Sequence, residues 1–233
     1  MKNLFGFIFL LSFITSCTIH QHYSFPKTTK TIKDLDEPDP VFDSAILLRT
    51  GKSSASGVII KIDNNKTAWA LSAKHFCIKV KNKVEAYASP HKSENVIKFD
   101  ASVEKMHSFL DLCILKLNGD TTSVKPLQLM TKNLYSGMRV HTIGAPAGLW
   151  PSKSTGYVVG FAKSNHAPSN YKIFDIIIVS ISSFYGSSGC PIYNDDRELV
   201  GIIVAVNKKY HHNSLGIPPL PIKNFLNSFF KNR

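Results

Sequence analysis

Three residues spread along the chain have the types that nucleophilic catalysis requires. Ser188 lies in the segment Gly186-Ser187-Ser188-Gly189-Cys190-Pro191, a tight turn ahead of a strand-like segment. A serine hydroxyl is a weak nucleophile unless a base takes its proton and donors stabilise the oxyanion that its attack creates. Glycine at position 186 would let the N–H groups of Gly186 and Ser188 turn toward one point, as in an oxyanion hole. By itself, a Gly-x-Ser-Gly segment is also typical of a plain turn.

A histidine and an aspartate supply the partners that such a serine needs. His75 follows an apolar run that ends in small residues, and it is the candidate base. Asp111 is the lone carboxylate in the apolar run 109–117. Leaving a buried carboxylate unpaired is costly, and an imidazole N–H is a suitable partner whose tautomer the carboxylate fixes. The sequence therefore predicts a triad of Ser188, His75 and Asp111 for acyl transfer, a reaction that requires no cofactor.

The elements that must position these residues are mostly short strands. From about residue 44 onward, short β-like runs alternate with turn-forming stretches, as in a barrel or a sandwich. The predicted strands cover residues 45–49, 57–62, 68–72, 96–101, 112–117, 139–143, 157–161, 173–181 and 199–206. Only the end of the chain looks helical, with Pro221 suited to a first helical position. Its apolar residues follow the spacing of one helix face: Ile222, Phe225, Leu226, Phe229 and Phe230.

In these motifs the chain resembles the trypsin-like peptidases, and specifically the HtrA/Deg branch of bacterial envelope proteases. The similar segments occur in family order within about residues 44–230: Ser56–Ile60, Leu71–His75, Asp111–Leu117, Ile143–Leu149, Thr155–Val158, Gly186–Pro191, Leu199–Ile202 and Gly216–Pro218. The resemblance implies an all-β fold of two six-stranded antiparallel β-barrels, chymotrypsin-like, with a C-terminal α-helix. The chain order His, Asp, Ser also argues against an α/β-hydrolase, whose order is Ser, Asp, His.

The resemblance further implies a serine endopeptidase domain over residues 41–233, with barrel halves at roughly 41–125 and 126–233. Its substrates would be polypeptides of the envelope or the exterior. By alignment to the family, Ser182 would lie near the floor of the primary specificity pocket, and Ala205, Val206 and Asn207 along one wall. None of them is acidic, so a preference for small or medium apolar side chains is expected. No PDZ domain is expected after the helix, and whether the chain forms a homo-oligomer, as many relatives form trimers, stays open.

The chain departs from the family pattern near the nucleophile. Cys190 replaces the second glycine after the serine, which could tilt the serine, and Ser187 stands where the family has Asn or Asp. Lys74 directly precedes the predicted base, although strand alternation should point it away. Two alternatives therefore stay open. The chain could be a catalytically weak member that acts as a polypeptide-binding or chaperone-like lipoprotein, or an esterase on the same fold.

The N-terminus predicts export and membrane anchoring. Lys2 and the apolar run 4–14 have the layout of a secretory signal, because the run is too short to cross a bilayer as a helix. Residues 14–17 resemble the bacterial lipobox, which implies that residues 1–16 are removed and Cys17 is acylated. An ordinary signal peptide with an incidental cysteine is the alternative. Residues 17–40 are typical of a tether. We expect a lipoprotein of the bacterial envelope, with the periplasmic face as its location.

Neither the cysteines nor the histidines predict a metal site. If Cys17 is lipidated, Cys77, Cys113 and Cys190 remain, so at least one stays free, and the sequence does not assign a pairing. Their spacings match no zinc pattern, and the pair His20 and His22 supplies too few ligands. Three further histidines are expected to be surface residues: His107, His211 and His212.

The formal net charge of +12 at pH 7 could indicate nucleic acid, an anionic membrane surface or acidic substrates. The lysines are spread along the chain and form no block of five or six like charges. No nucleic-acid-binding motif accompanies them. A solvated or membrane-facing surface is therefore favoured, and no nucleic-acid partner is expected.

Overall fold

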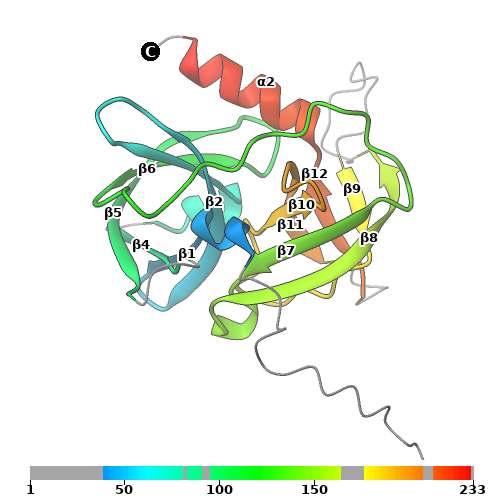
Figure 1. Cartoon of the computed structure of the whole chain (residues 1–233), viewed down its shortest axis with the longest axis horizontal. Helices are drawn as coiled ribbons and strands as arrows, with labels where there is room; N and C mark the ends of the chain where they lie inside the picture. Colours follow the sequence, from blue (N-terminus) through cyan, green and yellow to red (C-terminus); the bar gives the residue numbers. More distant parts are fainter. Residues whose placement is uncertain (1–38, 81–82, 91–94, 164–175, 207–211, 232–233) are drawn as a thin grey trace, which may run out of the picture. The chain divides into compact units, whose positions relative to one another are not determined.

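The computed structural model describes residues 39–80, 83–90, 95–163, 176–206 and 212–231. These residues belong to one compact unit, residues 37–233. Two closed six-stranded antiparallel β-barrels build this unit, with a helix at its C-terminal end (Figure 1). The predicted fold class is confirmed.

Barrel 1 is closed in the order β1-β2-β3-β6-β5-β4. Its strands are β1 (Ala45–Thr50), β2 (Ser53–Ile62), β3 (Ala68–Ser72), β4 (Val84–Ala88), β5 (Ile97–Met106) and β6 (Cys113–Asn118). Alternate residues of a strand face opposite sides of the sheet, so Val84, Ala86 and Ala88 of β4 point inward and are buried. Phe99 and Leu115 fill the same interior.

Barrel 2 repeats the arrangement in the order β10-β11-β12-β9-β8-β7. Its strands are β7 (Arg139–Gly144), β8 (Ser152–Ala162), β9 (Ile176–Val179), β10 (Pro191–Asn194), β11 (Leu199–Val206) and β12 (Ser214–Ile217). Its interior is filled by branched side chains such as Val140, Val158 and Ile192, which suit a pleated, buried surface.

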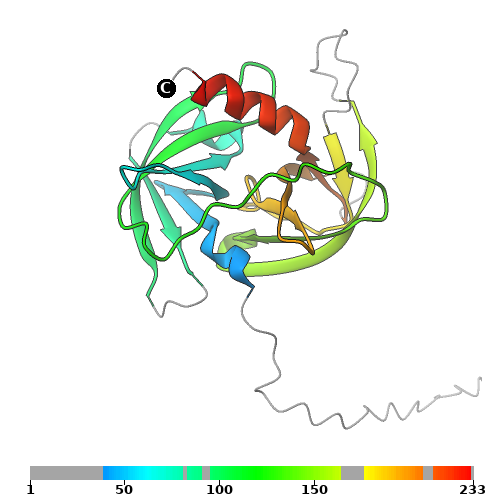
Figure 2. The same cartoon turned by 45° about the horizontal axis from the view of Figure 1, so that its top comes forward.

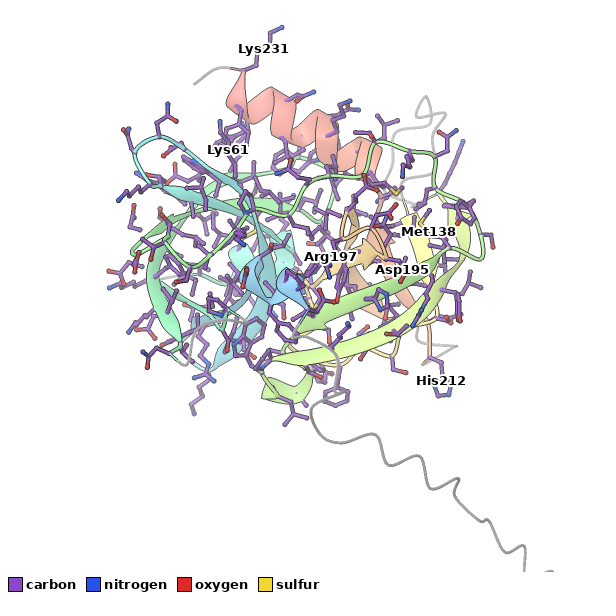
Figure 3. The ribbon with its side chains drawn as sticks, in the orientation of Figure 1. Lys61, Met138, Asp195, Arg197, His212 and Lys231 are labelled. Carbon is purple, nitrogen blue, oxygen red and sulfur yellow. A yellow bond between two sulfur atoms is a disulfide. The ribbon has the colours of Figure 1, made fainter. Side chains whose placement is uncertain are left out.

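A further apolar cluster joins the two barrels to the C-terminal helix α2 (Pro219–Phe230). Leu71 of barrel 1, Ile202 of barrel 2 and Phe225 of α2 are all buried in this cluster. The helix lies across both barrels (Figures 1 and 2). Its last turn is held by Phe229, whose ring centroid lies 5.4 Å from that of Trp69. Lys61, labelled in Figure 3, places its ammonium 4.3 Å from the centroid of the Phe230 ring.

Several element boundaries differ from those expected. Two short strands, β4 and β12, were not predicted, because four or five residues carry too little periodicity to stand out, whereas β10 lies in the strand-like segment expected after the Ser188 turn. The helix begins at Pro219 rather than at Pro221, since the earlier proline also suits a first helical position. His75 lies in a helical turn, α1 (Lys74–Cys77), instead of at a strand end. The described residues also form 3₁₀ turns at Pro40–Asp43 and Pro146–Gly148.

The cysteine pairing that the sequence left open is resolved within the described residues. Cys77 and Cys113 form a disulfide with a Cα–Cα distance of 6.6 Å, whereas Cys190 is free and buried. Cys17 and the predicted signal segment lie outside the described residues. None of the helices in the described part of the chain is both long and apolar enough to span a bilayer.

Candidate active site

The structure brings the three predicted triad residues into one hydrogen-bond chain. Nε2 of His75 lies 2.8 Å from Oγ of Ser188, and Nδ1 of His75 lies 2.7 Å from Oδ2 of Asp111. A carboxylate can only accept, so Nδ1 carries the proton in a neutral ring and Nε2 presents its lone pair to the serine hydroxyl. This order of groups lets His75 accept the proton of Ser188.

The three side chains come from places far apart in the sequence. His75 lies in α1 after β3, and Asp111 directly precedes β6, so both belong to barrel 1. Ser188 lies in the turn before β10 of barrel 2, and its backbone carbonyl accepts from the N–H of Ser56 in β2 at 2.8 Å. The candidate site therefore lies where the two barrels meet, and a backbone hydrogen bond fixes the serine turn to barrel 1.

A covalent link holds the histidine and aspartate segments together. Cys77 follows His75 by two residues, and Cys113 follows Asp111 by two residues, so the disulfide lies directly beside the pair. Both cysteines are buried, at 3% and 0% exposure. The second oxygen of Asp111, Oδ1, accepts from the backbone N–H of His75 at 2.7 Å. The carboxylate thus contacts both the ring and the backbone of the base.

Two backbone N–H groups beside the serine are uncommitted. Among the described residues, neither the Gly186 N–H nor the Ser188 N–H donates to a protein acceptor. The Tyr185 carbonyl accepts from the Ala147 N–H at 2.7 Å, and in a trans peptide the Gly186 N–H points the opposite way. Gly186 has φ of +96°, and a Cβ there would lie 2.2 Å from the Ala145 oxygen. Only glycine fits this position, and its N–H is left free to stabilise an oxyanion.

Ser56 is a buried cross-link that the sequence did not single out. Its hydroxyl donates to the Gly186 carbonyl at 2.8 Å and accepts from the Ala145 N–H at 3.0 Å. Its own carbonyl accepts from the Ser72 hydroxyl at 2.7 Å. A small polar residue inside the apolar strand 55–60 was the signal that could have revealed it. These bonds fix the backbone on both sides of the serine turn.

Cys190 is accommodated by a compensating glycine. The thiol is 1% exposed, and burial raises its pKa to about 11, so it is protonated at neutral pH. A Cβ added to Gly144 would lie 1.9 Å from the Cys190 sulfur, which means that the thiol occupies the space left by that glycine. Ser188 keeps its hydrogen bond to His75, so in this structure Cys190 does not displace the nucleophile.

The residues expected around the specificity pocket are placed as follows. Ser182 is exposed and follows β9. Ala205 and Val206 are the last two residues of β11, and Ala205 is exposed whereas Val206 is half-buried. Asn207 lies outside the described residues. The structure adds two serines to this region, because the hydroxyls of Ser183 and Ser214 bond to each other and Ser214 donates to the Ile181 carbonyl at 2.5 Å. A hydroxyl pair next to Ser182 was not foreseen from the sequence.

The polar residues flanking the triad have specific partners. Lys74 donates to the Ser108 carbonyl at 3.1 Å, so its ammonium is bonded to the turn before Asp111. The hydroxyl of Ser187 accepts from the Phe184 N–H at 3.1 Å.

The histidines expected at the surface differ in their exposure. The prediction for His107 is wrong, because this side chain is half-buried and accepts from the Leu110 N–H in the turn before Asp111. His212 is exposed. His20, His22 and His211 lie outside the described residues.

A second histidine forms a similar chain on the outer side of the barrel 2 sheet, because its strand neighbour Val140 faces the interior. Nδ1 of His141 lies 2.8 Å from the Thr155 hydroxyl, and Nε2 lies 2.7 Å from Oδ1 of Asp195. Asp195, labelled in Figure 3, lies on the turn between β10 and β11. The ring of His141 also packs 5.3 Å from that of Tyr193. No group of three or more His, Cys, Asp or Glu side chains in the described part of the chain is arranged to hold a metal ion.

Comparison with known proteins identifies the family. A family model of the trypsin-like peptidase domain matches residues 55–202, more than half of the 233 residues. The chain belongs to the trypsin-like peptidase family. No curated protein matches this family member in sequence.

Solved structures of proteases share the fold. The HtrA-type protease AlgW, solved with a tripeptide, is similar with a TM-score of 0.69 and 18% identity, covering 83% of this chain and 62% of that chain. A serine endoprotease from Yersinia pestis is similar with a TM-score of 0.66 and 18% identity, and the match covers 82% of this chain and 64% of that chain. A third structure is Rv3671c from M. tuberculosis H37Rv, a serine-to-alanine mutant in an inactive form. It is similar with a TM-score of 0.66 and 16% identity, and the match covers 83% of this chain and 94% of that chain. This chain thus spans nearly all of the mycobacterial chain and less than two thirds of the other two.

Proposed function

We propose that this family member is a serine endopeptidase that hydrolyses polypeptides by acyl transfer. Ser188 attacks the peptide carbonyl while His75 takes its proton, and Asp111 keeps His75 in the required tautomer. The N–H groups of Gly186 and Ser188 hold the oxyanion. His75 then protonates the leaving amine, and water activated by the same histidine hydrolyses the acyl-enzyme. The continuous chain from Ser188 through His75 to Asp111, at 2.8 and 2.7 Å, carries this proposal.

Two observations favour catalysis over a role limited to binding polypeptides. The departure that most threatened catalysis, Cys190, is compensated by Gly144. The two donors required for the oxyanion are free in the described structure, and Gly186 has the positive φ that such a turn needs. A disarmed site would have no physical reason to retain this combination of free donors and bonded base.

We further propose that the peptidase is exported and anchored through acylated Cys17, with polypeptides at the periplasmic face of the envelope as substrates. The disulfide between Cys77 and Cys113 supports export, because disulfides persist in oxidising compartments. Several acyl chains on one residue would hold the protein stably, since each buried methylene contributes about 0.8 kcal/mol. Mass spectrometry of the membrane-extracted protein tests this, and an unmodified N-terminus that retains residues 1–16 would contradict it.

At the primary specificity pocket we propose a preference for small or medium apolar side chains. Ser182, Ser183 and Ser214 are small and uncharged, so none of them offers a counter-ion for lysine or arginine. A peptide-library cleavage profile measures this directly. Cleavage dominated by basic residues would refute it.

The activated serine is tested with a fluorophosphonate probe on the full-length protein. We expect the wild type to react, and Ser188→Ala and His75→Ala to lose labelling by at least about 1,000-fold, because each removes part of one catalytic unit. Ser102→Ala, which alters an exposed hydroxyl on β5, is the matched control and should label like the wild type.

Two outcomes of that experiment would change the proposal. A folded wild type that does not react would leave the polypeptide-binding alternative as the better one. A reactive protein that hydrolyses a small ester but cleaves no protein or peptide would be an esterase. Casein and a p-nitrophenyl ester, assayed in parallel, separate these two results.

A further inference from the structure

The turn that ends in Asp111 is closed from inside by a histidine side chain. Nδ1 of His107 accepts from the backbone N–H of Phe109 at 3.1 Å and from that of Leu110 at 2.9 Å. The backbone N–H of His107 donates to the Leu112 carbonyl at 2.9 Å. Asn and Asp side chains commonly close turns in this way by accepting from the N–H two or three residues ahead. Here an imidazole does so, four residues before the carboxylate.

This arrangement requires one protonation state of His107. A nitrogen that accepts from two N–H groups must present a lone pair, so the ring is neutral and its proton is on Nε2. Protonation would place an N–H on Nδ1 that faces the N–H groups of Phe109 and Leu110. Both hydrogen bonds would then be lost, and the turn would lose its internal acceptor.

The surroundings of His107 favour the neutral ring. The side chain is half-buried, and its ring centroid lies 5.1 Å from that of Phe225 in α2. Burial, and in second place the Lys74 cation of α1, lower the pKa of His107 below its ordinary value of 6.5. From α2 the contact is the uncharged ring of Phe225, and the carboxylate of Asp111, at the end of the turn, is bonded to His75.

A second side chain holds the same turn from α1. Lys74 donates to the carbonyl of Ser108, the residue next to His107. The turn is therefore fixed on both sides, by His107 within it and by Lys74 of the helical turn that carries His75. Because each oxygen of Asp111 is 2.7 Å from a nitrogen of His75, a small movement of the turn would disturb both contacts.

We propose that His107 is a positioning residue of the triad, whose neutral imidazole fixes the turn that presents Asp111 to His75. His107 itself touches neither the nucleophile nor the oxyanion donors and acts through Asp111. The catalytic consequence rests on the proposed peptidase function. A misplacement of about 1 Å in a catalytic unit can cost about 100-fold in rate, so the turn is a sensitive place to lose a hydrogen bond.

Two variants of the full-length protein test the acceptor role. His107→Ala removes the acceptor, and we expect kcat to fall roughly 10- to 100-fold with KM unchanged, because Asp111 acts on the chemical step. His107→Asn restores an acceptor oxygen near the position of Nδ1, and we expect kcat within about threefold of wild type. His212→Ala, at an exposed residue labelled in Figure 3, is the control and should leave kcat unchanged. Equal losses in the Ala and Asn variants would overturn the proposal, since they would assign the effect to ring packing on Phe225.

The pH profile separates positioning from simple packing. Protonation of His107 should lower kcat/KM by about the same 10- to 100-fold as His107→Ala, so log kcat/KM of the wild type should fall more at acidic pH than that of His107→Asn. The lowered pKa of His107 places its proton uptake below 6.5, so its contribution is intact above that pH and is lost as the pH falls. His107→Asn should lack this additional fall, because an asparagine side chain does not titrate. An equal additional fall in His107→Asn would overturn the proposal.

A measurement independent of activity keeps this inference distinct from the proposed function. Nitrogen-15 NMR of the imidazole rings should show Nδ1 of His107 unprotonated and Nε2 protonated at neutral pH. In His107→Asn, the Leu110 amide should keep its slow hydrogen exchange, whereas in His107→Ala it should exchange faster. A proton on Nδ1 would overturn the role of His107 even in an active enzyme. The expected tautomer in a protein without a reactive serine would support the turn geometry and refute only the peptidase.

Discussion

Two chains of hydroxyl, imidazole and carboxylate occur among the described residues, and they differ in how they are assembled. In barrel 2, His141 lies directly opposite Thr155 of β8 and Tyr193 of β10 in the strand ladder. Its side chain is 9% exposed, and its carboxylate partner Asp195 is 59% exposed. The candidate catalytic histidine, His75, is 41% exposed and is bonded to residues outside the strands of both barrels.

The difference shows that the three groups alone do not make a catalyst. The His141 chain follows from strand register, because His141 and Thr155 lie opposite each other on adjacent strands and their side chains therefore make a cross-strand contact. Its Thr155 is a β-branched residue within a strand. Ser188, by contrast, lies on a turn beside two free N–H donors, where attack on a carbonyl can be stabilised. Exposure of the candidate base and free donors beside the hydroxyl distinguish the candidate catalytic chain from the His141 chain.

Replacing the carboxylate in each chain should give the largest contrast. Asp111→Asn leaves the shape intact but can favour the wrong tautomer of His75, so we expect kcat to fall by about 10⁴-fold. Asp195→Asn should change kcat by less than about twofold and cost about 0.5–1.5 kcal/mol of unfolding free energy. Steady-state kinetics and urea denaturation of both variants measure the two effects. Comparable losses of kcat would mean that the His141 chain takes part in catalysis.

The residues of the candidate catalytic chain could be chosen from the sequence, but the residues that support them could not. His75 follows an apolar run, Asp111 is the lone carboxylate within one, and Ser188 lies in a Gly-Ser turn, so no packing requirement accounts for these three polar residues. The two barrels followed from the strand pattern together with the family resemblance. The pairing of Cys77 with Cys113 could not be predicted, because connectivity depends on which segments the fold brings together.

The missed residues share a physical reason. His107 and Ser56 act through backbone groups, and such contacts depend on turn geometry and on neighbouring strands rather than on the residue's own type. His141 was hidden inside a predicted strand, where alternation alone does not identify its partners. One signal was present for His107, since a histidine four residues before the predicted carboxylate is well placed to close its turn.

Removing the disulfide between Cys77 and Cys113 tests how the His75 chain is held together, and its main readout is the free energy of unfolding. The cross-link joins residues 36 apart beside the catalytic pair, whereas strand pairing holds the His141 chain together. Loop-closure entropy for this separation predicts that Cys77→Ala/Cys113→Ala loses about 3–4 kcal/mol of unfolding free energy. We also expect kcat to fall more than in Asp195→Asn, because His75 and Asp111 lose their link.

Chemical denaturation with and without a thiol reductant measures the disulfide effect. The reductant should destabilise the wild type and leave the double variant unchanged, which makes the variant its own control. The wild type should react slowly while folded, because both cysteines are buried. Equal stability of the oxidised and reduced wild type would show that the link contributes nothing.

The smallest effect is expected at Asp39, which connects the His141 chain of barrel 2 to the start of the described residues. Asp39 accepts from Tyr193, the ring that packs on His141, at 2.7 Å and from Lys153 at 2.8 Å. Burial opposes ionisation of Asp39, but the hydrogen bonds from Lys153 and Tyr193 outweigh it and hold the pKa below 3.8. A carboxylate with a lowered pKa stabilises the fold at pH values above 3.8, and this contribution is lost as the pH falls through the folded-state pKa.

Asp39→Asn should therefore cost about 1 kcal/mol of unfolding free energy at pH 7, and the difference from wild type should shrink below pH 4. Activity at pH 7 should be unchanged, because the network is structural. Asp196→Asn is the control, because the side chains of Asp196 and Lys132 are 65% and 71% exposed and solvent screens their ion pair, so its loss should have little effect on stability. Urea denaturation across pH 3 to 7 gives the comparison. A constant difference between Asp39→Asn and wild type would show that the hydrogen-bond geometry of Asp39, rather than its charge, stabilises this end of barrel 2.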